Sequence, residues 1–178
     1  MSVINKINPV GIDTVIDDLQ ELLYSGLTAK GWTNYDSYPR VYKNETKDGL
    51  IPEFYTSKGD YQEVYFDDRI NASSFWLVDD STEQQNNPNY TAKVKVVFQA
   101  NLDKLYNSIS HRADEEMHKD VSLILDDSMV VSRYNKKITT GIKKIYNEEG
   151  LSSTDGFEDM SYYHVVKFDM EVTFRYKC

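Results

Sequence analysis

The sequence predicts a single α+β domain over residues 1–178, with a mainly antiparallel sheet and two main helices packed on one face. Three observations lead to this fold class. Two segments show the apolar spacing of helices, two long segments alternate between apolar and polar residues, and strands follow each helix in the chain. A chain of 178 residues can bury one sizeable core, and no internal repeat or change of composition indicates a second domain.

Both predicted helices are amphipathic. The first starts near Asn8-Pro9, and acidic residues in its N-terminal half complement the helix dipole. Its apolar stripe consists of Ile12, Val15, Ile16, Leu19, Leu22, Leu23 and Leu27. The second takes Ser110 as its N-cap and ends near Asp127. Its buried stripe consists of Ala113, Met117, Val121, Ile124 and Leu125.

The remaining segments are predicted from β-branched and aromatic residues and from turn chemistry. Short strands are expected within Pro39–Lys43, Tyr61–Phe66 and Ser73–Val78, separated by glycine-containing turns. The wholly polar stretch Ser81–Asn89 predicts a mobile loop. Later in the chain, a strand is expected over Lys136–Tyr146 and an acidic loop over Glu148–Met160.

The strongest strand signals lie in Tyr90–Leu102 and Tyr162–Lys177. Strict alternation places one set of side chains on the core face and the other in solvent or at an interface. Both segments exceed the usual strand length of roughly 5–6 residues, so we expect extended hairpin strands that pair with a neighbouring subunit. The outward positions predicted to carry subunit contacts are Lys93, Lys95, Gln99, Tyr163, Lys167, Glu171 and Arg175.

Composition narrows the function classes. The formal net charge of −9 argues against nonspecific nucleic-acid binding, which needs lysine and arginine to neutralise phosphates. A lone cysteine, Cys178, and an N-terminus without a signal-peptide pattern predict a protein kept in a reducing cytoplasm. The 14 tyrosines fit either half-buried strand aromatics or assembly contacts. Eight of them are too many for one core: Tyr24, Tyr35, Tyr38, Tyr42, Tyr55, Tyr61, Tyr65 and Tyr90.

Catalytic signatures are missing from the sequence. No GxSxG, P-loop, GxGxxG or CxxC pattern occurs, so we predict a protein that is not an enzyme and holds no cofactor. The alternative is a small metal-binding module or metal-dependent enzyme. On a helix, His111, Glu115 and His118 fall within about 60° of arc and could bind a divalent metal, although a solvated polar face explains them without a metal. His164, on the apolar face of the last strand, is expected to be a core or interface histidine.

The order of elements resembles that of bacteriophage tail terminator and tail-completion (neck) proteins. The resemblance rests on the N-terminal amphipathic helix, the strands that follow, the run Ser110-His111-Arg112-Ala113-Asp114-Glu115-Glu116 and the strand Tyr162–Lys177. It implies a structural virion protein of the tail or neck, assembled in the host cytoplasm.

The resemblance also implies partners. Its members form a homo-oligomeric ring, commonly a hexamer, that caps the tail tube protein and joins it to the head–tail connector protein. DNA passes through the ring lumen without specific binding, and no membrane is involved. Connector and tube subunits share similar strand-rich layouts, so the sequence leaves open which of these ring proteins the chain is.

Overall fold

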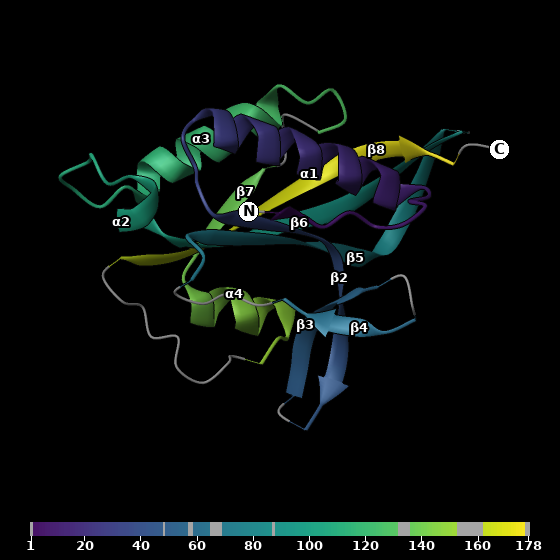
Figure 1. The fold of residues 1–178 in the computed structure, drawn as a ribbon. Helices are drawn as coiled ribbons and strands as arrows, with labels where there is room; N and C mark the ends of the chain where they lie inside the picture. The colour runs from purple at the N-terminus through teal and green to yellow at the C-terminus, as the bar shows by residue number, and fades with distance from the viewer. Residues whose placement is uncertain are drawn as a thin grey trace.

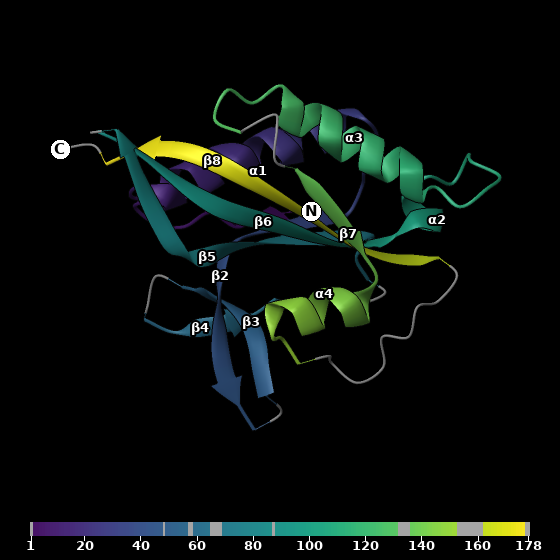
Figure 2. The same ribbon diagram turned by 180° about the vertical axis from the view of Figure 1, so that it is seen from behind.

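The structure, a computed structural model, describes residues 2–47, 49–56, 59–64, 69–86, 88–131, 136–152 and 162–176. This part of the chain forms an α+β fold with four helices and one mixed, mostly antiparallel sheet (Figures 1 and 2). The helices are α1 (Ile12–Ala29), α2 (Leu102–Leu105), α3 (Asp114–Asp126) and α4 (Ile142–Glu149). The strands are β1 (Ser2–Val3), β2 (Tyr35–Thr46), β3 (Gly49–Tyr55), β4 (Tyr61–Glu63), β5 (Ala72–Asn86), β6 (Asn89–Asn101), β7 (Lys137–Thr140) and β8 (Tyr163–Arg175).

The sheet is centred on its three longest strands. Its order is β4-β3-β2-β5-β6-β8-β7, and β1 pairs with β2 outside this path. β2 runs parallel to β5 and to β1, whereas the other pairs are antiparallel. β6 and β8 pair along their whole length, from Asn89 opposite Arg175 to Asn101 opposite Tyr163. The long alternating segments of the sequence are therefore neighbours at the middle of the sheet.

Helices cover both faces of this sheet. α1 and α3 lie against one face and α4 lies against the other (Figures 1 and 2). The larger core joins the stripes of α1 and α3 to the sheet side chains Trp76, Val96, Phe98 and Phe168. The smaller core packs Ile142, Ile145 and Tyr146 of α4 against Phe75, Val97 and Val165 of the sheet. Consecutive residues such as Val96 and Val97 are thus buried on opposite faces, as strand geometry requires.

A close approach between α1 and α3 depends on one glycine. An added Cβ at Gly26 would lie 2.7 Å from Cδ1 and 2.9 Å from Cγ1 of Ile124. The missing side chain therefore lets the two helices pack closely above the sheet.

Several sequence predictions are confirmed. The first helix, its apolar stripe and both long alternating strands are present. Residues Pro39–Lys43 fall within β2, and Ser73–Val78 fall within β5. The stripe of the second helix is buried as expected, from Ala113 to Leu125. Tyr65 and Phe66, and residues 153–160 of the expected acidic loop, lie outside the described residues.

Four predictions are corrected. Ser81–Asn89 is not a loop, because β5 continues to Asn86 and β6 begins at Asn89, which makes a hairpin held by backbone pairing. Ser110 does not cap the second helix, which begins at Asp114 with Ala113 as N-cap. The strand expected over Lys136–Tyr146 is β7 followed by α4. The acidic residues Glu148 and Glu149 close α4 and do not start a loop.

Candidate interaction surfaces

The seven residues predicted to carry subunit contacts divide into an accessible set and a buried set. Lys93 and Arg175 are exposed, and Tyr163 and Glu171 are half-buried. Gln99 and Lys167 are buried, and the Lys95 side chain is only 16% exposed. The prediction that all seven face outward is wrong for Gln99 and Lys167, because α4 covers this part of the sheet.

The buried set attaches α4 to the sheet. The Lys167 ammonium lies 2.7 Å from the carboxylate of Glu149 and 3.0 Å from that of Glu148. Lys95 Nζ lies 3.0 Å from the other Glu149 oxygen and 2.6 Å from Asp79. Both lysines thus hold the last turn of α4, where acidic side chains oppose the helix dipole and need a counter-charge.

Gln99 also attaches α4 to the sheet, through two side-chain hydrogen bonds. Its amide nitrogen donates to the Tyr146 hydroxyl at 2.9 Å, and its amide oxygen accepts from the Ser73 hydroxyl at 3.1 Å. Burial raises the pKa of Tyr146 to about 12, so its hydroxyl remains protonated at neutral pH. Gln99 is therefore a structural contact between β6, β5 and α4.

Electrostatics in the cluster favour the ionised pair. Burial alone raises the pKa of Glu149, but hydrogen bonds from Lys167 and Lys95 outweigh it and hold that pKa below its ordinary value. Burial likewise lowers the pKa of Lys167, but the hydrogen bonds that Lys167 donates to Glu149 and Glu148 raise it above its ordinary value. Both shifts stabilise the charged forms, so the lysines and the carboxylate remain paired at neutral pH.

A polar hollow of about 510 Å³ lies beside the buried cluster. Four lysines and five carboxylates line it together with two apolar residues: Asp79, Lys93, Val94, Lys95, Lys137, Glu148, Glu149, Lys167, Asp169, Met170 and Glu171. Along the strands, Lys93 lies opposite Glu171 and Lys95 lies opposite Asp169. Because these charges nearly cancel, the hollow suits a polar protein surface better than a phosphate or a metal ion.

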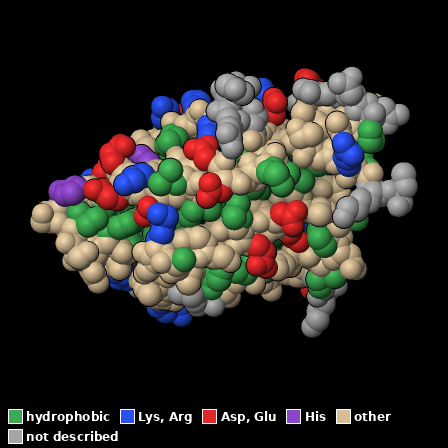
Figure 3. Space-filling view, turned by 90° about the horizontal axis from the view of Figure 1, so that it is seen from above, with side chains coloured by type: hydrophobic (Ala, Val, Ile, Leu, Met, Phe, Trp, Pro, Cys, Tyr) green, Lys and Arg blue, Asp and Glu red, His purple; other side chains and the backbone are tan. Residues whose placement is uncertain are grey.

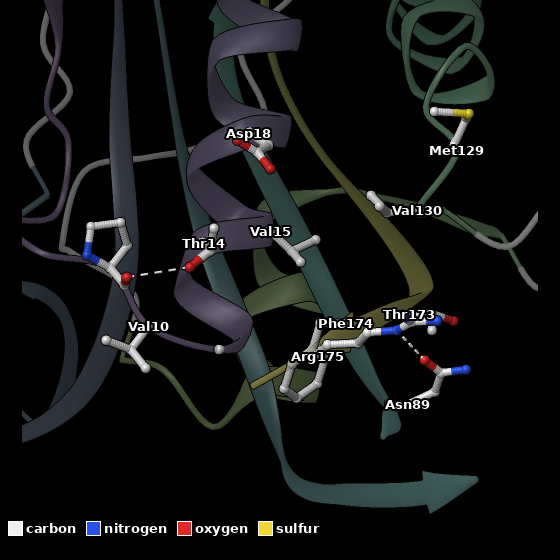
Figure 4. A pocket seen from close by; sticks show the side chains of 12 residues that line it. Val10, Thr14, Val15, Asp18, Asn89, Met129, Val130, Thr173, Phe174 and Arg175 are labelled. Atoms are coloured by element: carbon white, nitrogen blue, oxygen red, sulfur yellow. Dashed lines mark hydrogen bonds between the residues drawn. The ribbon is translucent and has the colours of Figure 1, made fainter. Parts of the chain in front are cut away.

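An apolar groove of about 640 Å³ lies at the end of the molecule where α1 begins. The start of α1, residues 129–130 and the end of β8 line it (Figure 4). Val10 is 66% exposed and Met129 is fully exposed at 101%. Asp18 and Arg175 add charges of opposite sign to its lining, and Arg175 Nε donates to Asn89 Oδ1 at 2.5 Å.

The two edges of the sheet carry complementary side chains. In the described part of the chain, β4 and β7 are the terminal strands of the sheet path. β4 exposes Tyr61 (45%) and Glu63, whereas β7 exposes Ile138 (42%) and Lys137. Each short edge thus combines one exposed apolar side chain with one charge, and the two charges are opposite in sign.

The tyrosines predicted as assembly contacts serve different roles. Tyr35 and Tyr38 are buried in the cores, where Tyr35 stacks on Tyr24. Tyr55 and Tyr61 are exposed at the β3–β4 edge and contact each other edge-to-face at 5.4 Å. Tyr65 lies outside the described residues. Of these tyrosines, Tyr55 and Tyr61 are therefore accessible for an assembly contact.

The candidate metal ligands do not converge. His111 precedes the helix and contacts Glu116 at 2.8 Å, so the predicted single helical face is wrong. His118 instead faces His164 on β8, with 2.9 Å between their Nε2 atoms. In the part of the chain that the structure describes, no group of three or more His, Cys, Asp or Glu side chains could hold a metal. His164 is buried, in agreement with the prediction of a core histidine.

The outer face of the helical layer has a mixed character. Acidic side chains are scattered over it, with hydrophobic side chains between them, and histidine side chains lie at one end (Figure 3). Leu123, near the C-terminal end of α3, is a large apolar residue that is 49% exposed. This face therefore lacks a pattern as specific as that of the sheet edges.

Sequence reasoning missed two buried contacts between elements. Glu149, the centre of the ionic cluster, was assigned to a loop, although Ile142, Ile145, Tyr146 and Glu149 have the spacing of a helical face. The pairing of His118 with His164 joins residues far apart in the chain, so no local pattern could have indicated it.

Comparison with family models and with curated sequences finds no relative. No protein-family model matches the chain. No curated protein sequence matches it either. Among the helices described, none combines the length and the apolar character needed to cross a membrane.

Proposed function

We propose that this protein is a structural subunit of a phage-type tail: a terminator or neck ring subunit that caps the tail tube and joins it to the head connector. One observation carries the proposal. The sheet ends on both sides in short strands, β4 and β7, with exposed side chains that complement each other.

Pairing between the β7 edge of one copy and the β4 edge of the next accounts for the assembly of several copies into a ring. An edge strand presents backbone N–H and C=O groups that another chain can bind. If β7 of one copy pairs with β4 of the next, every copy uses two different surfaces, and such heterologous contacts generate a ring when the rotation between copies closes. Ile138 and Tyr61 then become buried, while Lys137 and Glu63 bring opposite charges to the same interface.

The other surfaces fit contacts with neighbouring rings. Lys93, Glu171 and Arg175 line the open part of the β6–β8 face, near the end of the β5–β6 hairpin. We assign this end of the molecule to the tail tube protein or the head–tail connector protein. The net charge of −9 limits adhesion of DNA that passes through the lumen. The subunit assembles in the host cytoplasm and resides in the virion, in a ring that is a hexamer by the resemblance.

Solution mass tests the proposal. Light scattering over a concentration series, with and without purified tail tubes, is expected to show a ring of several copies, either alone or on the tubes. A chain that stays monomeric at every concentration and ignores tail tubes would refute the ring function.

Charge exchange tests the edge contact itself. Lys137→Glu or Glu63→Lys is expected to weaken assembly by about tenfold, and the double exchange is expected to restore it. Lys119→Glu, on an exposed lysine of α3, serves as the matched control. If the double exchange assembles no better than the single variants, β7 and β4 are not the joining edges.

A further inference from the structure

The N-terminal arm, Ser2–Lys6, is attached to the edge of β2 by hydrogen bonds. Its strand β1 pairs in parallel with Asp36 and Ser37 of β2. Ser2 donates to the Asp36 carboxylate from its backbone N–H at 3.0 Å and from its hydroxyl at 2.9 Å. The Ile4 N–H donates to the Ser37 carbonyl at 2.9 Å. The arm therefore adds a short strand to an edge that would otherwise be open.

Helix α1 holds the arm from its other side. Gln20 is fully buried, and its amide nitrogen donates to the Ile4 carbonyl at 3.1 Å and to the Ser37 carbonyl at 2.9 Å. Because both of these partners can only accept, the orientation of the amide is fixed. α1 and β2 thus form a clasp around the arm, which consists of Asp13, Gln20, Glu21, Asp36, Ser37 and Tyr42.

The side chains of the arm match this clasp as well as its main chain does. Asn5 donates to Glu21 of α1 at 3.1 Å. Lys6 forms an ion pair with Asp13 of α1 and donates to the Tyr42 hydroxyl at 3.1 Å. These contacts specify an extended segment with the polar side chains of the arm. The occupant that fits the clasp is therefore the arm of this chain, from the same copy or from another.

The connection between the arm and α1 is strained where it turns back. Asn8 has a φ of +52°, in the left-handed region, and directly precedes Pro9. A residue before proline favours an extended conformation, so the turn stores strain at this position. The turn also leaves Ile7 62% exposed and Val10 66% exposed. Straightening of residues 7–11 would relieve the strain at Asn8.

An arm that leaves its own clasp can make the same contacts with another copy. Exchange of an identical segment preserves the contacts in the clasp, and a short, strained connection favours it. We propose that the arms are exchanged in the assembled protein, so that the arm of each copy occupies the clasp of the next. This inference rests on the proposed ring, because it uses the contact between β7 and β4.

The clasp lies on the side of the sheet where the next copy is expected. Asp36 and Ser37 pair with β5 on one edge of β2 and with β1 on the other. Further along β2, that other edge pairs with β3, which leads to β4. The connection starts near the opposite side, since a Cβ on Gly11 would lie 2.5 Å from Cε1 of Tyr176, just after β8.

The connection is long enough to cross the contact between two copies. If β7 pairs with β4 of the next copy, four strand spacings separate β8 of one copy from β2 of the other, or about 19 Å at about 4.8 Å each. The chain from Lys6 to Ile12 has six Cα–Cα steps and spans about 20 Å when extended. An extended connection therefore reaches the clasp of the neighbour.

Disulfide trapping tests the exchange. Ser2 and Asp36 are direct partners in the register of β1 and β2, so cysteines at these positions can form a disulfide. Chains with Ser2→Cys and chains with Asp36→Cys, both with Cys178→Ser to remove the native thiol, are mixed, assembled and oxidised. We expect covalent pairs of the two chains on a non-reducing gel, because such a pair needs an arm in the clasp of another copy.

The doubly substituted chain, with Ser2→Cys and Asp36→Cys, separates the outcomes. Light scattering first establishes the mass of the particle, and oxidation is then expected to give a ladder of several linked chains. Assembled particles whose disulfides form only within chains, or whose thiols both stay free, would overturn the exchange and leave the ring intact. A chain that stays monomeric even on tail tubes would instead refute the ring, and the exchange with it.

A change in the connection gives an independent measurement. Asn8→Gly accepts a positive φ without strain, so it should favour the arm in its own clasp. In the doubly substituted chain, the linked fraction is expected to fall by about threefold. Asn107→Gly, at an exposed asparagine of another loop, is the matched control and should leave the linked fraction unchanged. Equal linked fractions in the two glycine variants would overturn the role of the strained connection.

Discussion

The two faces of the central sheet hold different chemistry under their helices. Beneath α1 and α3 the sheet contributes Trp76, Phe98 and Phe168 to a continuous apolar core. Beneath α4 the smaller core ends in the ionic cluster of Lys167, Lys95 and Glu149. In the first region almost any well-packed apolar contact suffices, whereas in the second each charge depends on a named partner. Loss of one group should therefore act through packing on one face and through unpaired charge on the other.

The largest effect is expected on the apolar face. Phe98 is fully buried, and its ring centroid lies 6.0 Å from those of both Trp32 and Phe168. Phe98→Ala should lower the free energy of unfolding by about 4 kcal/mol, because it removes buried area and leaves a cavity. Urea denaturation in low and in high salt measures this loss of free energy, which is expected to be equal under both conditions. Phe98→Leu is the matched control and should lose less than half as much.

The ionic face should respond almost as strongly to one substitution. Glu149→Ala leaves Lys167 buried beside Lys95 without their shared partner, and should lower the free energy of unfolding by about 3 kcal/mol. Glu148→Ala, which removes a more exposed partner of the same lysine, should have a clearly smaller effect. Replacing the pair together, with Glu149→Leu and Lys167→Met, should come close to wild type in urea denaturation. If Glu148→Ala lowers the free energy of unfolding as much as Glu149→Ala, the contribution of a carboxylate in this cluster does not depend on its burial.

The ionic cluster beneath α4 should also make the stability of the protein decrease in acid. The pKa of Glu149 is lowered from its ordinary value of 4.5, so its contribution to stability is complete above pH 4.5. It is lost as the pH falls through the lower pKa of the folded state. As the pH is lowered from about 6 to 3, the free energy of unfolding should therefore decrease more steeply in wild type than in the Glu149→Leu, Lys167→Met variant. Parallel curves would show that the pair titrates alike in folded and unfolded chains.

The smallest effect concerns the fit of the helical layer. Gly26→Ala raises helix propensity but places a methyl group 2.7 Å from Ile124 Cδ1. We expect a net loss of about 1 kcal/mol on thermal or urea unfolding. Ile124→Val removes that Cδ1, so the double variant should be less destabilised than the sum of the two single changes. A stabilised Gly26→Ala would show that α1 and α3 adjust their distance freely.

The regular elements could be predicted because their signals are local. The stripe of α1 repeats with the period of a helix, and the alternation of β6 and β8 identifies residues such as Val94 and Met170 as core. The β5–β6 hairpin end was missed since its polar residues carry no periodicity, and backbone pairing between distant positions holds them in strands. α4 was missed because Gly141 divides a stretch whose first half is a strand.

The sequence by itself determined the α+β class, the first helix and which side chains of the long strands face the main core. Periodicity is a property of neighbouring residues, so it assigns side chains to a face without saying what covers that face. Only the tertiary structure decided that α4 lies over the second face and buries Lys167, and that His118 meets His164. Those contacts join segments distant in the chain. Their geometry follows from how the layers pack, which no local pattern encodes.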